Sequence, residues 1–168
     1  TGGTFNITCT PDSMPTCLND VVVNFTKLVD SLDLKSMNGS NNPFAYKVLP
    51  FSGGSDHYIF NDGALKVPSV MFGHDDIFHH TSLDTPDKVD ASELRRVCFI
   101  ALGSTYYLAN ASEKEAAEMS RLVSRNGLSR LSSDYYDVLQ KMEKAEKEDE
   151  LHKACLLYTS DAADEEDS

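Results

Sequence analysis

The chain has 168 residues, of which 40% are hydrophobic and 25% are charged, a composition typical of a globular protein. Its formal net charge is −12, and no dense cluster of Lys and Arg stands out. Nucleic acids and anionic membranes are bound through such clusters, so we expect neither as a partner. No apolar run approaches the length that spans a bilayer, and no basic-then-apolar signal segment opens the chain.

Both ends of the sequence are unusual. The start at Thr1 lacks an initiator methionine, so we expect the chain to be a piece of a longer protein. Residues 155–168 do not continue the helical pattern before them. Their codons can spell the end of a transposon adapter used to prepare sequencing libraries. We therefore interpret this stretch as translated adapter sequence rather than an acidic tail, and exclude it from the fold.

The remaining cysteines are Cys9, Cys17 and Cys98, a dispersed set without metal-binding C-x-x-C spacing. Cys9 and Cys17 could pair in an oxidising compartment or stay as free thiols. Four N-x-S/T sequons would permit glycosylation of a secreted protein, at Asn6, Asn24, Asn38 and Asn110. These features do not decide the compartment, and a secreted or periplasmic location stays open.

In the first half of the chain we expect two strands, a long helix and a short helix. Residues 5–8 favour an extended segment. Apolar residues at spacings of three and four from Leu18 to Leu32 predict an amphipathic helix. Residues 45–49 predict a strand that Pro50 ends. A glycine-rich turn then leads into a short helix, which Ser55 or Asp56 would cap.

In the second half we expect one further strand and three helices. Residues 68–72 form a short apolar run, typical of a buried strand. Asp90 with Glu93 three residues later predicts a capped helix start, as does Ser112 with Glu115. The second of these helices would end at Asn126-Gly127, and a last one would start at Ser132 or Ser133 and run to about residue 154. One face of the first would carry Leu94, Val97, Cys98, Ala101, Thr105 and Leu108.

Alternating strands and helices predict an α/β sandwich, a fold in which sites form on the loops that leave strand ends. The loop after the 68–72 strand contains seven His and Asp residues: His74, Asp75, Asp76, His79, His80, Asp84 and Asp87. Imidazoles and carboxylates are the natural ligands of zinc. Their density alone is weak support, because polar loops are often only solvated.

The order of short motifs is more specific. The segment Phe78-His79-His80-Thr81-Ser82-Leu83-Asp84-Thr85 resembles the aromatic/His-His-Thr-x-x-Asp-Thr segment of the bacterial leucyl aminopeptidase-like zinc peptidases. That family also includes glutamate carboxypeptidase, glutaminyl cyclase and transferrin receptor relatives. Upstream, Ser55-Asp56-His57 followed by Phe60 resembles its Ser-Asp-His-x-x-Phe element. Residues 63–72 resemble its Gly-x-Pro-apolar strand, with two extra residues.

The resemblance implies that residues 1–110 are the C-terminal portion of a three-layer α/β/α sandwich with a mixed sheet. Residues 111–154 would be a helical extension. It also implies two zinc ions held by two His, a bridging Asp and two further carboxylates. In the family, the last zinc ligand in chain order is the His directly before Thr. In this sequence that residue is His80. The other ligands and the general-base Glu would precede Thr1.

Five more residues are candidates for supporting roles. Asp84 would accept a hydrogen bond from His80 or cap the following turn. His79 stands where relatives often carry Tyr, so it would line the pocket, although His79 and His80 compete as the ligand. Ser55, Asp56 and His57 would line the pocket or support the ligands. The alternative for the last two is a helix cap and a buried His bound to backbone.

The resemblance therefore predicts a zinc-dependent aminopeptidase that acts on peptides with a free N-terminus. This chain alone would be inactive, because it lacks the general base and most ligands. Two alternatives stay open on the same scaffold. One is a non-catalytic, receptor-like homologue, and the other is a glutaminyl-cyclase-type acyltransferase.

Overall fold

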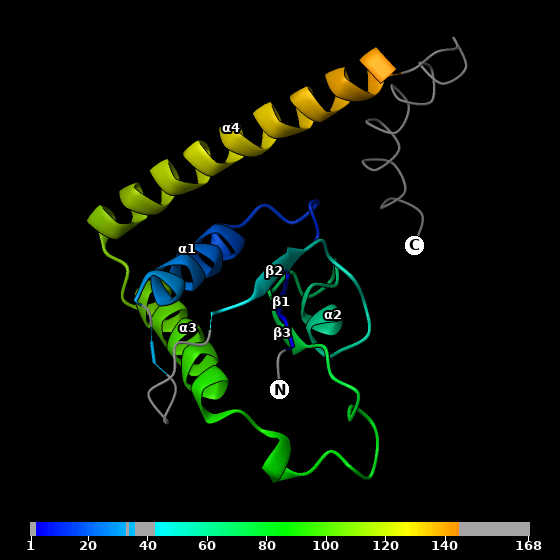
Figure 1. The fold of residues 1–168 in the computed structure, drawn as a ribbon. Coiled ribbons are helices and arrows are strands. Elements are labelled where there is room, and N and C mark those ends of the chain that lie inside the picture. The colour runs from blue at the N-terminus through cyan, green and yellow to red at the C-terminus, as the bar shows by residue number, and fades with distance from the viewer. Residues whose placement is uncertain (1–2, 33, 36–42, 145–168) are drawn as a thin grey trace. The chain divides into compact units, whose positions relative to one another are not determined.

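A computed structural model describes residues 3–32, 34–35 and 43–144. Its elements in chain order are β1 (Phe5–Thr8), α1 (Leu18–Ser31), β2 (Tyr46–Leu49), α2 (His57–Phe60), β3 (Met71–His74), a 3₁₀ turn (Pro86–Lys88), α3 (Ala91–Ala109) and α4 (Glu113–Lys144) (Figure 1). The chain divides into two compact units, residues 1–119 and 120–168. The first unit contains every element except most of α4.

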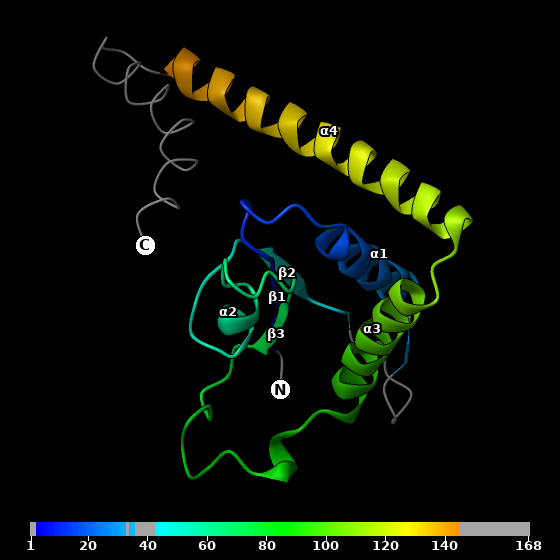
Figure 2. The same cartoon turned by 180° about the vertical axis from the view of Figure 1, so that it is seen from behind.

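The strands form one mixed sheet in the order β2-β1-β3. β1 pairs in parallel with β2, with Phe5 opposite Tyr46, and antiparallel with β3, with Phe5 opposite His74. The parallel pair requires a crossover, which α1 provides. In Figures 1 and 2, α1 and α3 lie on one side of the strands and α2 lies on the other.

The hydrophobic core lies between the sheet and the pair α1 and α3. Its buried members come from β1, both long helices and the segment before β2: Phe5, Ile7, Val22, Val29, Phe44 and Ile100. Alternate residues of β1 point to opposite faces of the sheet. Phe5 and Ile7 join this core, so Asn6 and Thr8 project toward the α2 side, where both are buried. The predicted mixed α/β architecture is confirmed, but a full three-layer sandwich is not shown by the described residues.

Three predicted boundaries were wrong in informative ways. β3 begins at Met71 rather than at residue 68. The backbone N–H and carbonyl of Ser69, just before β3, are bonded to the Asn61 side chain instead of to a neighbouring strand. The Asn61 amide accepts from the Ser69 N–H at 2.9 Å and donates to the Ser69 carbonyl at 2.7 Å. α4 runs without a break through Asn126-Gly127 and Ser132-Ser133. A single glycine costs a helix only about 1 kcal/mol relative to alanine, which long continuous helices tolerate.

α3 buries only part of its predicted apolar face, of which Val97 packs against the core. Its buried residues are Ser92, Arg96, Ile100 and Ser104, whereas Leu94 and Cys98 are exposed. The helix carries apolar side chains around most of its circumference, so periodicity alone did not single out the face that packs. Close packing against α1 chose it: a Cβ on Gly103 would lie 2.8 Å from a Phe25 ring carbon.

The helix starts were predicted better than the faces. The Asp90 side chain caps α3 by accepting from the N–H groups of Ser92 and Glu93. Glu115 accepts from the Ser112 N–H at 3.0 Å, as in a capping box. Asp56 occupies the N-cap position of α2, but its side chain makes no capping hydrogen bond. Residues 145–168, which include the predicted adapter stretch, lie outside the described residues.

Candidate metal-ligand loop

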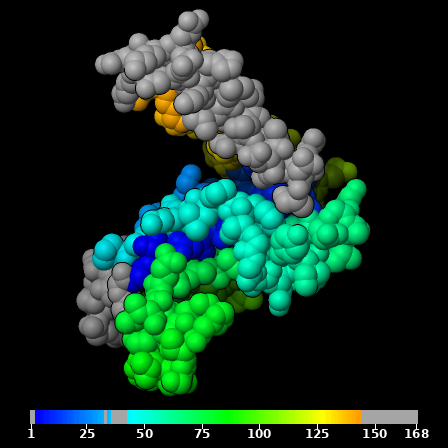
Figure 3. Space-filling model, turned by 90° about the vertical axis from the view of Figure 1, so that its right-hand side faces the viewer, coloured from blue at the N-terminus to red at the C-terminus, as the bar shows by residue number. Residues whose placement is uncertain are grey.

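The candidate site lies on the loop that connects β3 to α3. It starts after His74, the last residue of β3, and ends at Asp90, the residue that caps α3. His79, His80 and Asp84 all belong to this loop, so one connection holds three of the six predicted site residues. In Figure 3 the loop (green) projects from the first unit. The cyan-to-teal segment around α2 lies elsewhere on the same face.

Asp76 organises the first turn of the loop. Its Oδ1 accepts hydrogen bonds from the Phe78 N–H at 2.7 Å and from the His79 N–H at 2.9 Å. On the other side of Phe78, the carbonyl oxygen accepts from the Thr81 N–H at 3.0 Å and the Thr81 hydroxyl at 2.6 Å. The backbone of Phe78 is therefore held at both of its peptide groups.

His79 and His80 both expose their side chains, and their rings stack with centroids 3.8 Å apart. His80 has a φ of 59°, in the left-handed region. That conformation costs a residue with a Cβ about 1–2 kcal/mol, so the turn around it must compensate. Within the described part of the chain, no hydrogen bond uses a ring nitrogen of His80. The imidazole is thus open to a ligand on its exposed side.

Asp84 does not contact His80 through a hydrogen bond in the described residues. Its backbone N–H donates to the Thr81 carbonyl at 3.2 Å, which continues the turn, and its carboxylate is exposed. The carboxylate lines a cavity of about 200 Å³ between the loop and the start of α3. The wall exposes more apolar than polar surface and includes the cation Lys88 beside acidic and apolar residues, whereas His79 and His80 do not line it.

The end of the loop is held by charged contacts. The Lys88 ammonium lies 5.4 Å from the centroid of the Phe78 ring and forms an ion pair with Asp87. Lys88 and then the Thr85 hydroxyl, both bonded to the Asp87 carboxylate, hold the pKa of Asp87 below its usual range. These contacts bring the far end of the loop back onto Phe78, beside the histidines.

The α2 candidates lie in a different environment. Ser55 and Asp56 are exposed, whereas His57 is buried against the Phe51 ring. The His57 Nε2 is 2.8 Å from the Ser52 carbonyl, which assigns the ring proton to that nitrogen. The buried Nδ1 has no hydrogen-bond partner among the described residues. The ring closes a loop that includes Gly54, whose φ of 116° favours glycine.

The described ranges do not contain a complete metal site. Within them, no three His, Cys, Asp or Glu side chains gather so that they could hold an ion. His80 fits the role of one ligand, because its imidazole is exposed and free of competing hydrogen bonds. The other ligands of a zinc site would have to come from elsewhere.

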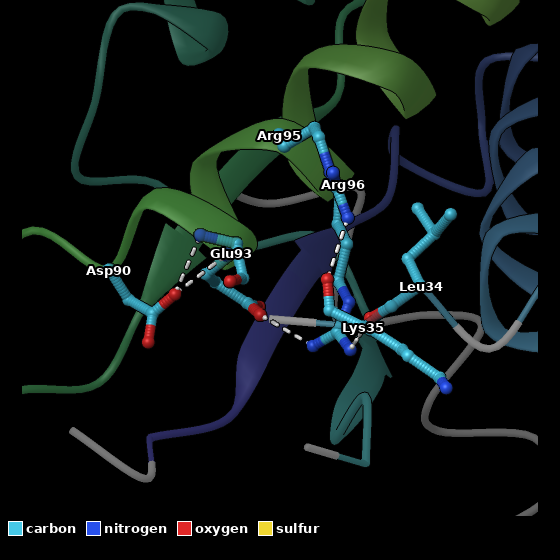
Figure 4. Close-up of polar contacts among 7 residues, drawn as sticks. Leu34, Lys35, Asp90, Glu93, Arg95 and Arg96 are labelled. Atoms are coloured by element: carbon cyan, nitrogen blue, oxygen red, sulfur yellow. Dashed lines mark hydrogen bonds and ion pairs between the residues drawn. The ribbon is translucent and has the colours of Figure 1, made fainter. Parts of the chain in front are cut away.

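Two residues that hold the loop and the start of α3 in place were not predicted from the sequence. Asp76 was one of several loop acids, although an Asp two residues before a turn residue is a known turn signal. Arg96 was not singled out at all. It reaches from α3 to the Leu34 carbonyl at 3.1 Å and to Glu93 at 3.4 Å (Figure 4). Its guanidinium also lies over the Phe44 ring. No local pattern signals such contacts across 62 residues.

Comparison with known proteins found no matching family model, no matching curated protein and no matching solved structure. In the part of the chain that the structure describes, no helix has the length and apolar character needed to span a membrane. Any functional assignment therefore depends on the motifs and the loop geometry.

Proposed function

We propose that this chain contributes His80 as one ligand of a two-zinc site in a metallo-aminopeptidase. The observation that carries the proposal is the exposed imidazole of His80, on a loop that directly follows a strand end and lies within a His-Thr-x-x-Asp-Thr motif. Catalytic loops commonly leave strand ends in α/β folds. The remaining ligands and the general base would belong to residues outside this chain.

Two features of the loop support a ligand role for His80. Zinc binds neutral imidazole through a nitrogen lone pair, and no hydrogen bond in the described residues occupies a His80 ring nitrogen. A left-handed φ at a residue with a Cβ is a local strain, and such strain clusters at functional sites.

The chemistry expected of the complete site is hydrolysis of the first peptide bond of a substrate. Two bound zinc ions would supply an activated water and polarise the scissile carbonyl. Within this chain, His80 would hold metal, and His79 would line the side of the pocket next to it. In the cavity that Asp84 lines, the acids Asp76, Asp90 and Glu93 outnumber the cation Lys88, so this cavity would favour a cationic group such as a free peptide amine.

The test replaces His80 with Asn in the longer protein that carries the other ligands. Asn is chosen because it tolerates positive φ better than Ala, so the turn should survive. We expect zinc content to fall by about one ion per molecule and hydrolysis of an aminoacyl p-nitroanilide to fall by at least about 100-fold. His79→Asn is the matched control and should retain both ions.

Three outcomes would contradict the proposal. Full zinc content and normal turnover in His80→Asn would exclude His80 as a ligand. Loss of zinc only in His79→Asn would move the role to His79. Zinc binding without hydrolysis, but with cyclisation of an N-terminal glutamine, would identify an acyltransferase.

A further inference from the structure

The turn that presents His80 contains one carboxylate, that of Asp76, which is bonded to its backbone. Asp76 accepts from the N–H groups of the two residues that precede His80, Phe78 and His79. A carboxylate that accepts two backbone donors acts as a local clamp, because both peptide planes are then fixed relative to one side chain.

The clamp acts directly on the conformation of His80. The peptide between Phe78 and His79 is held at both ends, because its N–H donates to Asp76 and its carbonyl accepts from Thr81. The Thr81 N–H also donates to this carbonyl, which closes the turn that has His80 as its third residue. The φ of 59° at His80 is then imposed from outside, since an unconstrained histidine favours negative φ. A change of φ would swing the imidazole to another side of the loop.

We infer that Asp76 is a positioning residue that holds the His80 imidazole in a zinc-accepting orientation. The inference rests on the proposed function, and it adds to it the residue that sets the ligand's direction. Asp84, the acid expected to brace His80, does not bond to it in the described residues, which leaves Asp76 as the acid that controls the histidine.

Asp75 provides a matched control. It is the adjacent acid and is also exposed, and no hydrogen bond in the described residues uses its carboxylate. Asp75→Ala and Asp76→Ala remove the same charge one residue apart. Asp76→Asn removes the charge but keeps an acceptor oxygen, so it tests whether the hydrogen bonds or the charge matter.

The first measurement uses this chain alone. In Asp76→Ala, we expect the amide protons of Phe78 and His79 to exchange with solvent about tenfold faster in NMR, while Asp75→Ala and Asp76→Asn stay within about twofold of the parent. Unchanged exchange in Asp76→Ala would overturn the inference, because the turn would then not depend on Asp76.

The second measurement uses the longer protein and competition with a chelator for zinc. Asp76→Ala should weaken zinc binding about tenfold, and Asp76→Asn should restore it. If His80→Asn weakens zinc binding but Asp76→Ala does not, the positioning role fails and the proposed function stands. If His80→Asn leaves zinc binding unchanged, both fail together. Equal losses in Asp76→Ala and Asp76→Asn would assign the effect to charge and overturn the positioning role.

Discussion

Removal of the Arg96 guanidinium should destabilise the first unit, because this side chain joins segments that are distant in the sequence. The side chain is almost fully buried, with 6% of its surface exposed, and it bonds to the Leu34 carbonyl, pairs with Glu93 and covers the Phe44 ring. It thereby ties the start of α3 to the segments that follow α1 and precede β2. Arg96→Met keeps the apolar stem and removes the contacts of the guanidinium.

The expected cost follows from the contacts that are lost. A hydrogen bond from a charged donor contributes about 1.5–3 kcal/mol, and a cation–π contact contributes about 0.5–2 kcal/mol. The Glu93 side chain is 22% exposed, so water would replace part of its lost partner and the ion pair adds little. We therefore expect about 3 kcal/mol, which would lower the melting temperature by about 10 °C.

Arg95 supplies the control for this experiment. It is the neighbouring residue and is exposed, and among the described residues its side chain donates to the Lys35 carbonyl at 2.9 Å (Figure 4). Arg95→Met should cost less than about 1 kcal/mol. Both variants can be compared by urea unfolding followed by circular dichroism. Equal losses in the two variants would show that burial of Arg96 is not what anchors α3.

Two further pairs of substitutions test the N-terminal cap of α3 and its packing against α1. Asp90→Ala should cost about 1 kcal/mol through loss of the cap, and Asp90→Asn should cost less. The capping bonds, chiefly from the Glu93 N–H, lower the pKa of Asp90, so its contribution to stability is present above the unfolded pKa of about 4 and is lost as pH falls through the folded pKa. Urea midpoints of the parent and Asp90→Asn should therefore converge in acid, and a constant difference would contradict the assignment. Gly103→Ala should destabilise by about 1–3 kcal/mol despite a better helix propensity, because its Cβ meets the Phe25 ring, whereas Gly127→Ala in α4 should stabilise by up to about 1 kcal/mol. Stabilisation by both alanines would show that α1 and α3 do not pack closely at Gly103.

Local chemistry made much of the secondary structure predictable. β1, α1 and β2 were found within about a residue or two of their predicted bounds, and Asp90 caps α3 as predicted. Each depends on residues a few positions apart, through side-chain period or a cap. The predicted start of β3 was too early, because the side chain of Asn61, eight residues before Ser69, bonds to the Ser69 backbone.

For the candidate site, too, some features were predictable from the sequence and others depend on the folded loop. The sequence alone determined which residues carry the motifs, and it directed attention to His80 in the β3–α3 loop. The orientation of that histidine was decided by the folded loop, through the Asp76 clamp and the left-handed φ.

The sequence by itself determined where strands and helices form, because those choices depend on contacts between near neighbours in the chain. Only the tertiary structure decided which face of α3 is buried and that Arg96 anchors it to Leu34. The physical reason is that these choices minimise the free energy of packing and hydrogen bonding between segments that are distant in sequence. A one-dimensional pattern contains no record of which distant carbonyl a buried guanidinium will meet.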